Sequence, residues 1–194
     1  ARRRRRSAQA TAILGSAGRP LVGVELRIVD DDGVECPAGQ PGEVVVRAPG
    51  VMLGYHERPA ETAAALREGW FHTGDVGALD ADGRLTILDR KKDLIISGGE
   101  NVYSVDVEAV LARHPAIAEV AVIGVPDDRL GEAVAAIAVL RSGAALSAEE
   151  LIAHCRASIG AFKVPRHVRF VDALPRTPVG KVQKAALRDA WKGT

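Results

Sequence analysis

The chain has 194 residues, of which 47% are hydrophobic and 26% are charged, and its formal net charge is +1. This balance is typical of a soluble globular protein with one or two domains, and it gives no general reason to expect nucleic-acid binding. No apolar run approaches the roughly 18 residues that cross a bilayer, so we expect no membrane span. The two cysteines, Cys36 and Cys155, stand far apart without histidines at metal-ligand spacing. Neither a disulfide framework nor a metal site is therefore indicated, and the reducing cytoplasm is the expected location.

The N-terminal segment is strongly basic, with five consecutive arginines at Arg2 to Arg6 and no acidic residue before Glu25. A nucleic-acid or targeting patch, a solvated tail and a truncated end without its own function are the three interpretations. No apolar stretch of a secretory signal follows the arginines, and no aromatic residues are interleaved with them. The pattern favours a solvated or truncated end.

The first half of the chain predicts β-structure with one short helix. Apolar residues alternate with polar ones from Val22 to Ile28, which is the period of a strand with one buried face. Further along, we expect a strand at 43–47, a helix at 59–66 and a hairpin at 76–88 with Asp82 and Gly83 in its turn.

The second half interleaves helices and strands over about 100 residues, enough for a compact α+β domain. We expect a short buried strand at 94–96, a helix at 104–114 capped by Ser104, strands at 120–125, 133–140 and 167–171, a helix at 147–158 and a final helix from about Lys184. Ser147 and Glu150 form a capping-box pattern. The predicted fold is a three-stranded sheet flanked by helices, after a β-rich segment. The charged run at 89–92 places the domain boundary between residues 91 and 92.

Three segments carry polar groups that turn chemistry alone does not require: 71–75 (FHTGD), 89–100 (DRKKDLIISGGE) and 175–181 (PRTPVGK). Asp75 can accept hydrogen bonds from two neighbouring hydroxyls, and the Lys181 ammonium can meet phosphate or carboxylate oxygens. An ordinary turn aspartate and a solvated lysine are the alternatives when each segment is taken alone. The Walker, GxGxxG, GxSxG and HExxH patterns are absent.

In this order and spacing, six motifs resemble the acid–CoA ligases, or acyl-CoA synthetases, of the adenylate-forming superfamily. They are GSAGRPLVGVELRIVD, GEVVVRAPGVMLGY, GWFHTGD, DGRLTILDRKKDLIISGGENVYSVDVE, HPAIAEVAVIGVPDDRLGE and LPRTPVGKVQKAALR. The resemblance implies formation of an acyl-adenylate from a carboxylic acid and ATP, with Mg²⁺ in the full enzyme, followed by transfer of the acyl group to CoA. It also implies that residues 1–91 end a large N-terminal domain and that 92–194 form a mobile C-terminal domain.

The resemblance also assigns roles by position. Asp75 corresponds to the aspartate that binds the ATP ribose, Arg90 to its assisting arginine and Lys92 to the hinge residue. Lys181 corresponds to the lysine that contacts the carboxylate and α-phosphate during adenylation. For CoA, the corresponding residues are the channel glycines Gly98 and Gly99, with Phe162 and Arg166 at nucleotide positions; Glu100 faces the same site without an assigned role.

Some positions depart from the family pattern: Leu130 and Val164 stand where some relatives carry tryptophan and a basic residue. The ATP-phosphate loop and the acyl pocket of such enzymes belong upstream of Ala1, so we expect a fragment that is inactive without its large domain. Two other functions stay open. One is a catalytically inactive remnant or interaction module that retains the fold, and the other is an adenylating enzyme that loads a carrier protein.

Overall fold

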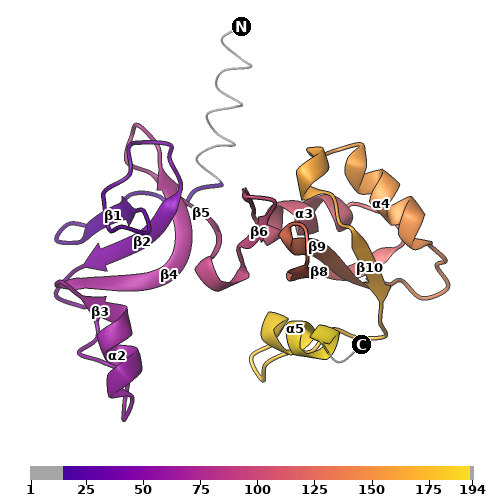
Figure 1. Ribbon diagram of the computed structural model, residues 1–194. Coiled ribbons are helices and arrows are strands. Elements are labelled where there is room, and N and C mark those ends of the chain that lie inside the picture. The colour runs from indigo at the N-terminus through magenta and orange to yellow at the C-terminus, as the bar shows by residue number, and fades with distance from the viewer. Residues whose placement is uncertain (1–14, 193–194) are drawn as a thin grey trace, which may run out of the picture. The chain divides into compact units, whose positions relative to one another are not determined.

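A computed structural model describes residues 15–192, and the arginine run at 2–6 lies outside this range. The described chain forms two compact units, of which the first ends at Lys92 and the second begins at Asp93 (Figure 1). The charged run at 89–92 predicts the boundary between residues 91 and 92, one residue before the boundary in the structure. Each unit has its own sheet and its own buried core, so each is described separately.

The first unit contains an antiparallel five-stranded sheet with the order β1-β2-β4-β3, and β5 pairs with β4 on the same sheet. The elements are β1 (Glu25–Val29), β2 (Gly42–Arg47), α2 (Pro59–Ala65), β3 (Leu66–Arg67), β4 (Trp70–Leu79) and β5 (Leu85–Arg90). Ile28, Val44 and Leu85 form its core cluster. The strand at 43–47, the hairpin and the single helix of this half are therefore confirmed, whereas the strand expected from Val22 begins only at Glu25; β4 carries the whole FHTGD motif.

The hairpin between β4 and β5 turns as its sequence predicts. The Asp80 carboxylate accepts hydrogen bonds from the backbone N–H groups of Asp82 at 2.9 Å and Arg84 at 2.8 Å. Gly83 has a φ of +73°, a backbone conformation that glycine adopts without strain. These local contacts fix the turn and the pairing of Leu79 with Leu85, and a register shift between Val76 and Gly77 then places Asp75 opposite Arg90.

The second unit contains a sheet of five strands, so the expectation of three is wrong. Its order is β10-β9-β6-β7, and β8 pairs with β9. The strands are β6 (Ile95–Ser97), β7 (Glu100–Val102), β8 (Ile117–Asp127), β9 (Gly131–Leu140) and β10 (His167–Phe170). The two additional strands are three residues long and form one hairpin, which joins the sheet where Ser97 pairs with Gly131. The short strand expected at 94–96 is therefore present as β6, but β7 and the attachment of the hairpin to the sheet are unexpected, because they depend on distant partners that local sequence patterns do not reveal.

Helices cover both faces of this sheet (Figure 1). The helices are α3 (Ser104–Leu111), α4 (Ala148–Arg156) and α5 (Lys184–Lys192). Leu111 of α3 and Leu151 of α4 pack in one cluster with Val134 and Ala136, whereas Leu187 of α5 packs in another with the odd-numbered residues of β9. Because successive side chains of a strand point to opposite faces, β9 is buried on both sides. The sheet is thus the middle layer of three.

The two predicted helix caps have different outcomes. The Ser147 hydroxyl accepts a hydrogen bond from the Glu150 backbone N–H, and the Glu150 carboxylate accepts one from the Ser147 N–H, so the capping box is confirmed. The Ser104 cap is wrong, because Tyr103 is the N-cap residue and Ser104 is buried inside α3. The Ser104 hydroxyl instead accepts a hydrogen bond from the Lys184 ammonium at 2.6 Å. A partner 80 residues away thus replaces the local one.

A buried carboxylate anchors the end of the first unit. The side chain of Glu43 on β2 is only 7% exposed, and its Oε2 lies 3.2 Å from the Lys91 Nζ and 3.3 Å from the His72 Nδ1. Burial raises the pKa of Glu43, but the contacts from Lys91 and His72 outweigh burial and hold that pKa below its usual value of 4.5. Lys91 also pairs with Asp31 at 2.9 Å. The Glu43 carboxylate therefore ties Lys91, which directly follows β5, and His72 of β4 to β2.

We expect this anchor to make the first unit sensitive to acid. A carboxyl group with a lowered pKa in the folded state contributes stability above its unfolded pKa, and that stability is lost as the pH falls through the folded pKa. Between about pH 5 and about pH 3, the unfolding free energy of the first unit should fall more steeply in the wild type than in Glu43→Gln. Urea unfolding followed by Trp70 fluorescence, in a Trp191→Phe background, measures this unit because Trp70 and Trp191 are the chain's two tryptophans.

Glu25→Gln is the matched control for this acid sensitivity. Glu25 also has a lowered pKa, caused first by its hydrogen bond with Arg47, but both side chains of that pair are about half exposed. Solvent screens such a pair, so its removal should change the pH profile less. A Glu43→Gln profile that parallels the wild type would contradict the role of the anchor.

The core of the second unit yields a separate prediction about stability. Leu151 of α4 is fully buried in the core of the unit. Leu151→Ala should therefore lower the unfolding free energy of this unit by about 2–5 kcal/mol, because it removes buried apolar surface and leaves a cavity. Trp191 fluorescence in a Trp70→Phe background reports the transition. Val179→Ala, at a side chain that is 80% exposed, should change it by less than about 0.5 kcal/mol. Equal effects of the two substitutions would show that Leu151 is not part of a packed core.

Candidate functional site

The FHTGD motif is held in an irregular part of β4. The Thr73 hydroxyl donates a hydrogen bond to the Val44 carbonyl at 2.8 Å and accepts one from the Asp75 backbone N–H at 3.1 Å. Gly74 has a φ of +70°, in the left-handed region that favours glycine. The hydroxyl and the glycine together fix the backbone that presents Asp75.

Asp75 and Arg90, predicted to share a function, face each other across β4 and β5. They are register partners, and the Arg90 Nε lies 3.0 Å from the Asp75 Oδ1. Arg90 also donates a hydrogen bond to the Thr73 carbonyl at 3.3 Å. About one third of the Asp75 side chain is exposed, so its carboxylate is oriented by the guanidinium and still reaches solvent.

Lys92, the expected hinge residue, lies beside this pair at the end of the first unit. A cavity of about 380 Å³ is lined by Gly74, Arg90, Lys91 and Lys92. Lys91 is held by Glu43 and Asp31, as described above, within the same unit. The chain is therefore anchored up to the residue that precedes Lys92.

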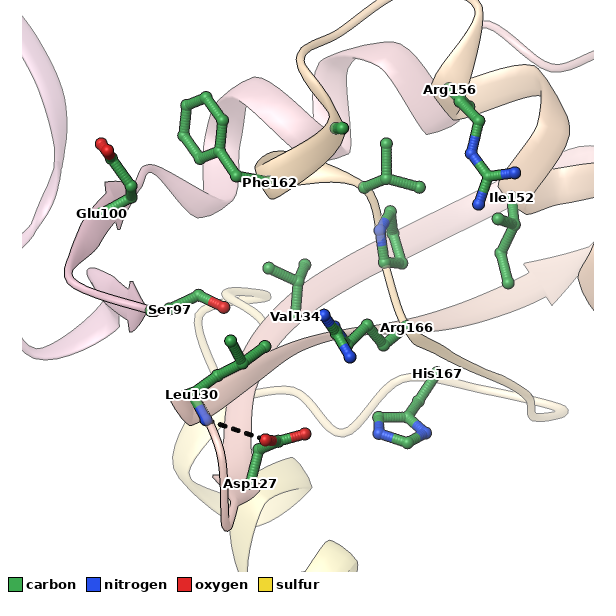
Figure 2. Close-up of a pocket in the computed structure, with 14 residues that line it drawn as sticks. Ser97, Glu100, Asp127, Leu130, Val134, Ile152, Arg156, Phe162, Arg166 and His167 are labelled. Carbon is green, nitrogen blue, oxygen red and sulfur yellow. Dashed lines mark hydrogen bonds between the residues drawn. The ribbon is translucent and has the colours of Figure 1, made fainter.

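A larger cavity of about 700 Å³ in the second unit brings together most of the predicted CoA residues (Figure 2). Gly98, Phe162 and Arg166 line it, and Glu100 and Leu130 do so as well. Phe162 is 47% exposed, so its ring can be reached from the cavity. Three segments that are distant in sequence, around Gly98, Leu130 and Phe162, thus line one cavity beside the β6–β7 hairpin.

The glycine pair forms the turn of that hairpin. Gly98 and Gly99 have φ values of +61° and +84°, the combination that a two-residue type I′ turn requires. The Gly98 N–H donates a hydrogen bond to the Leu130 carbonyl at 2.9 Å, and a Cβ on Gly98 would lie 3.2 Å from the Leu130 Cδ2. Gly98 borders the cavity, whereas Gly99 is not among its lining residues. The hairpin therefore accounts for both glycines through backbone geometry, and only Gly98 also through close approach.

Polar residues that the motif comparison did not single out also line this cavity. They are Ser97, Asp127, Arg156 and His167. The Asp127 carboxylate accepts hydrogen bonds from the backbone N–H groups of Arg129 and Leu130, both at 2.9 Å, and these bonds, with nearby Arg166, lower its pKa. Arg156 comes from α4, so its contribution depends on how that helix packs. No local pattern around these residues signals a shared cavity.

Lys181 lies apart from this cavity, in the loop between β10 and α5. Its side chain is exposed, and within residues 15–192 its ammonium group has no hydrogen-bond or ion-pair partner. Its backbone N–H donates to the Thr177 hydroxyl at 3.1 Å. The backbone of Lys181 is thus held while its charge is available to a ligand.

Residues 15–192 contain no group of three or more histidine, cysteine, aspartate or glutamate side chains arranged to hold a metal ion. No helix in that range is both long and apolar enough to cross a membrane. Cys36 and Cys155 are free thiols, and burial raises the pKa of Cys155 to about 11. Its low thiolate content at neutral pH is that of a structural cysteine.

Two family models match the chain in consecutive order. The AMP-binding enzyme model matches residues 4–56, and the AMP-binding enzyme C-terminal domain model matches residues 106–181. The first match falls in the first unit and the second in the second unit. The order agrees with the motif resemblance.

Whole-chain comparisons point the same way. A long-chain-fatty-acid–CoA ligase of Escherichia coli O6:H1 is 46% identical over 179 residues, which cover 92% of this chain and 32% of that protein. A feruloyl-CoA synthase of an Amycolatopsis species is 46% identical over 175 residues, which cover 90% and 36%. The crystal structure of ATP-bound MatB from Rhodopseudomonas palustris superposes with a TM-score of 0.85 at 40% identity, covering 92% of this chain and 36% of that one.

The chain spans about a third of the length of these relatives. Within that third, the similarity runs through both units and includes the fold as well as the motifs. The two ordered family models and the relatives therefore show that this chain belongs to the AMP-binding family of adenylate-forming enzymes.

Proposed function

We propose that this chain is the C-terminal part of an ATP-dependent acid–CoA ligase, which forms an acyl-adenylate and then transfers the acyl group to CoA. One observation carries the proposal: a single chain holds residues suited to both half-reactions, the Asp75–Arg90 pair in one unit and the Gly98–Phe162–Arg166 cavity in the other. The similarity to two CoA-forming ligases supports CoA as the acceptor. Because the chain spans about a third of those relatives, the proposed activity is that of the protein with its large domain.

In the adenylation step, Asp75 accepts hydrogen bonds from the two ribose hydroxyls of ATP. A carboxylate has enough acceptor sites for both hydroxyls while Arg90 holds its Oδ1. The Lys181 ammonium contacts the substrate carboxylate and the α-phosphate, and it stabilises the negative charge that develops at the α-phosphate as the carboxylate attacks and pyrophosphate leaves. Mg²⁺ arrives with the ATP phosphates, since this ion commonly binds substrate phosphates rather than an all-protein cage.

In the thioester step, the cavity of the second unit receives CoA. Its thiol arm passes the β6–β7 hairpin, where Gly98 offers no side chain. Phe162 provides an aromatic face for the adenine ring, and Arg166 provides a guanidinium for phosphate. Leu130 and Val164 give the same cavity two apolar walls, so Arg166 carries a larger share of the phosphate contacts than in relatives with a basic residue at position 164.

Lys92 acts as the hinge between the two half-reactions. Lys91 is tied to Glu43 in the first unit, and Asp93 is tied to Arg188 on α5 in the second. Rotation about the backbone is therefore concentrated at the residue between these two anchors. A hinge there lets the domain from residue 92 onwards present Lys181 in one state and the CoA cavity in the other.

The acid remains the open part of the substrate set, because the family's acyl pocket lies in the large domain. The two curated relatives act, by their names, on long-chain fatty acids and on ferulate. Fatty and aromatic acids are accordingly the first candidates, with fatty-acid metabolism as one setting. We also infer a cytoplasmic location, which suits two free cysteines. Ligation assays with a panel of both acid classes test the assignment.

Lys181→Ala should separate the two half-reactions in the full-length protein that contains this chain. Loss of one preorganised charged group should reduce acid-dependent pyrophosphate exchange by about a hundredfold to a thousandfold. Thioester formation from supplied acyl-adenylate should stay within about twofold of the wild type. Equal loss in both assays would remove the assigned role, and a wild type that is silent in both would favour an inactive family member.

Arg166→Ala should weaken recognition of the CoA nucleotide. The KM for CoA in the thioester step should rise about tenfold, whereas the KM for pantetheine, which has neither phosphates nor adenine, should not change. Arg113→Ala, at an exposed arginine outside the cavity lining, is the matched control. If both thiols lose affinity equally, Arg166 supports the cavity rather than binding phosphate. Transfer to a carrier protein in preference to CoA would redirect the proposal to that acceptor.

A further inference from the structure

The loop that carries Lys181 is a closed turn; we call residues 175–183 the lysine loop. The Thr177 N–H donates to the Lys181 carbonyl at 2.8 Å, and the Gly180 N–H donates to the Thr177 carbonyl at 2.8 Å. Arg176 and Val182 pair as an isolated β-bridge across it. Gly180 has a φ of +84°, which a side chain would strain. Gly180, the residue before Lys181, therefore has the backbone conformation that restricts this turn to glycine.

A single guanidinium group closes this turn and ties it to the sheet. The Arg176 NH1 donates to the Gly180 carbonyl at 2.6 Å, and its NH2 donates to the Glu119 carboxylate at 2.7 Å. The Gly180 carbonyl belongs to the peptide bond whose nitrogen is that of Lys181. Arg176 thus holds the plane of the peptide from which the lysine side chain departs.

The other end of this contact is rigid. Glu119 lies on β8, which pairs with β9 from Ile117 to Asp127, and Glu119 itself is opposite Val139. Both neighbouring sheet faces are buried under helices. The backbone of Glu119 is held by the sheet, so the guanidinium that binds its carboxylate connects the lysine loop to a packed strand.

The Arg176–Glu119 pair has little to do with folding stability. Both side chains are 43% exposed, and ion pairs with that much solvent contribute little to the free energy of folding. The tip of the loop is not held by packing, since Val179 is 80% exposed, whereas Val182 at the base of the loop packs against the core cluster that includes Leu187. The direction of Lys181, whose ammonium is unpaired within residues 15–192, therefore depends on polar contacts to the loop backbone.

We propose that Arg176, oriented by Glu119, is a positioning residue for Lys181 that holds the lysine loop in the conformation needed for adenylation. This inference rests on the proposed function, in which Lys181 meets the carboxylate and the α-phosphate. Arg176 itself touches no substrate in this arrangement. It acts by fixing the Gly180–Lys181 peptide, and a displacement of about 1 Å at such a group is enough to cost about a hundredfold in rate.

The test uses the full-length protein and compares the two half-reactions. Arg176→Ala should reduce acid-dependent pyrophosphate exchange by about 10- to 100-fold and leave thioester formation from supplied acyl-adenylate within about twofold. Glu119→Gln should reduce the exchange by a smaller factor, because the amide still accepts a hydrogen bond without the charge. Arg176→Lys should keep part of the exchange that Arg176→Ala loses, because the lysine retains the charge. The rescue should be incomplete, because an ammonium cannot hold both acceptors in the same fork geometry.

A second readout separates positioning from folding. Amide hydrogen exchange at Gly180 and Lys181 should speed up in Arg176→Ala, while the Tm stays within about 2 °C of the wild type. Arg141→Ala is the matched control, since the Arg141 Nε also donates to a backbone carbonyl of this unit, that of Pro115, at 3.0 Å. It should leave both half-reactions unchanged.

The outcomes distinguish this inference from the function on which it rests. If Lys181→Ala abolishes pyrophosphate exchange and Arg176→Ala does not reduce it, the positioning role is wrong and the proposed function stands. If Lys181→Ala leaves the exchange intact, the role of Lys181 and the positioning role that depends on it are both overturned, whereas a wild type without exchange would overturn the proposed function. A loss in Arg141→Ala equal to that in Arg176→Ala would also overturn the positioning role, because it would reflect a general loss of order.

Discussion

Ion pairs on either side of Lys92 tie its two neighbours to different units. Lys91 is bound to Glu43 and Asp31 in the first unit, and Asp93 is bound to Arg188 in the second. Each unit has its own sheet and core, and the 3-10 helix η1 (Lys91–Asp93) connects the two. Consecutive charges such as these cannot be buried without partners, and the two units supply those partners separately.

The segments that carry the candidate site residues share a second feature, which is that hydrogen bonds to backbone carbonyls hold them in place. Thr73 bonds to the Val44 carbonyl, Gly98 to the Leu130 carbonyl and Arg176 to the Gly180 carbonyl. A reactive group that must meet ligand cannot be buried, so packing alone cannot orient it. Hydrogen bonds to backbone carbonyls provide that orientation, while the side chains of Asp75, about one third exposed, and of Lys181 still reach solvent.

Local patterns predicted the elements whose cause is local. The Ser147 capping box and the Asp82–Gly83 hairpin depend on residues within four positions of each other, and both are present. Predictions that involved distant partners did less well. The second sheet has five strands instead of three because the β6–β7 hairpin joins at Ser97 and Gly131, and Ser104 does not cap α3 because its hydroxyl meets Lys184. Nothing in the surrounding residues of Glu43 or Glu119 indicated the cations that each would meet.

The sequence by itself determined the family, the mixed α/β class and the identity of the chemical groups, since motif order and side-chain type are properties of the chain. Only the tertiary structure decided which groups meet. It paired Asp75 with Arg90, gathered Gly98, Phe162 and Arg166 around one cavity without Gly99, and placed Arg176 between Glu119 and the Gly180 carbonyl. These contacts join residues up to 68 positions apart, from Gly98 to Arg166, and strand register and helix packing, rather than local propensity, set distances of that kind.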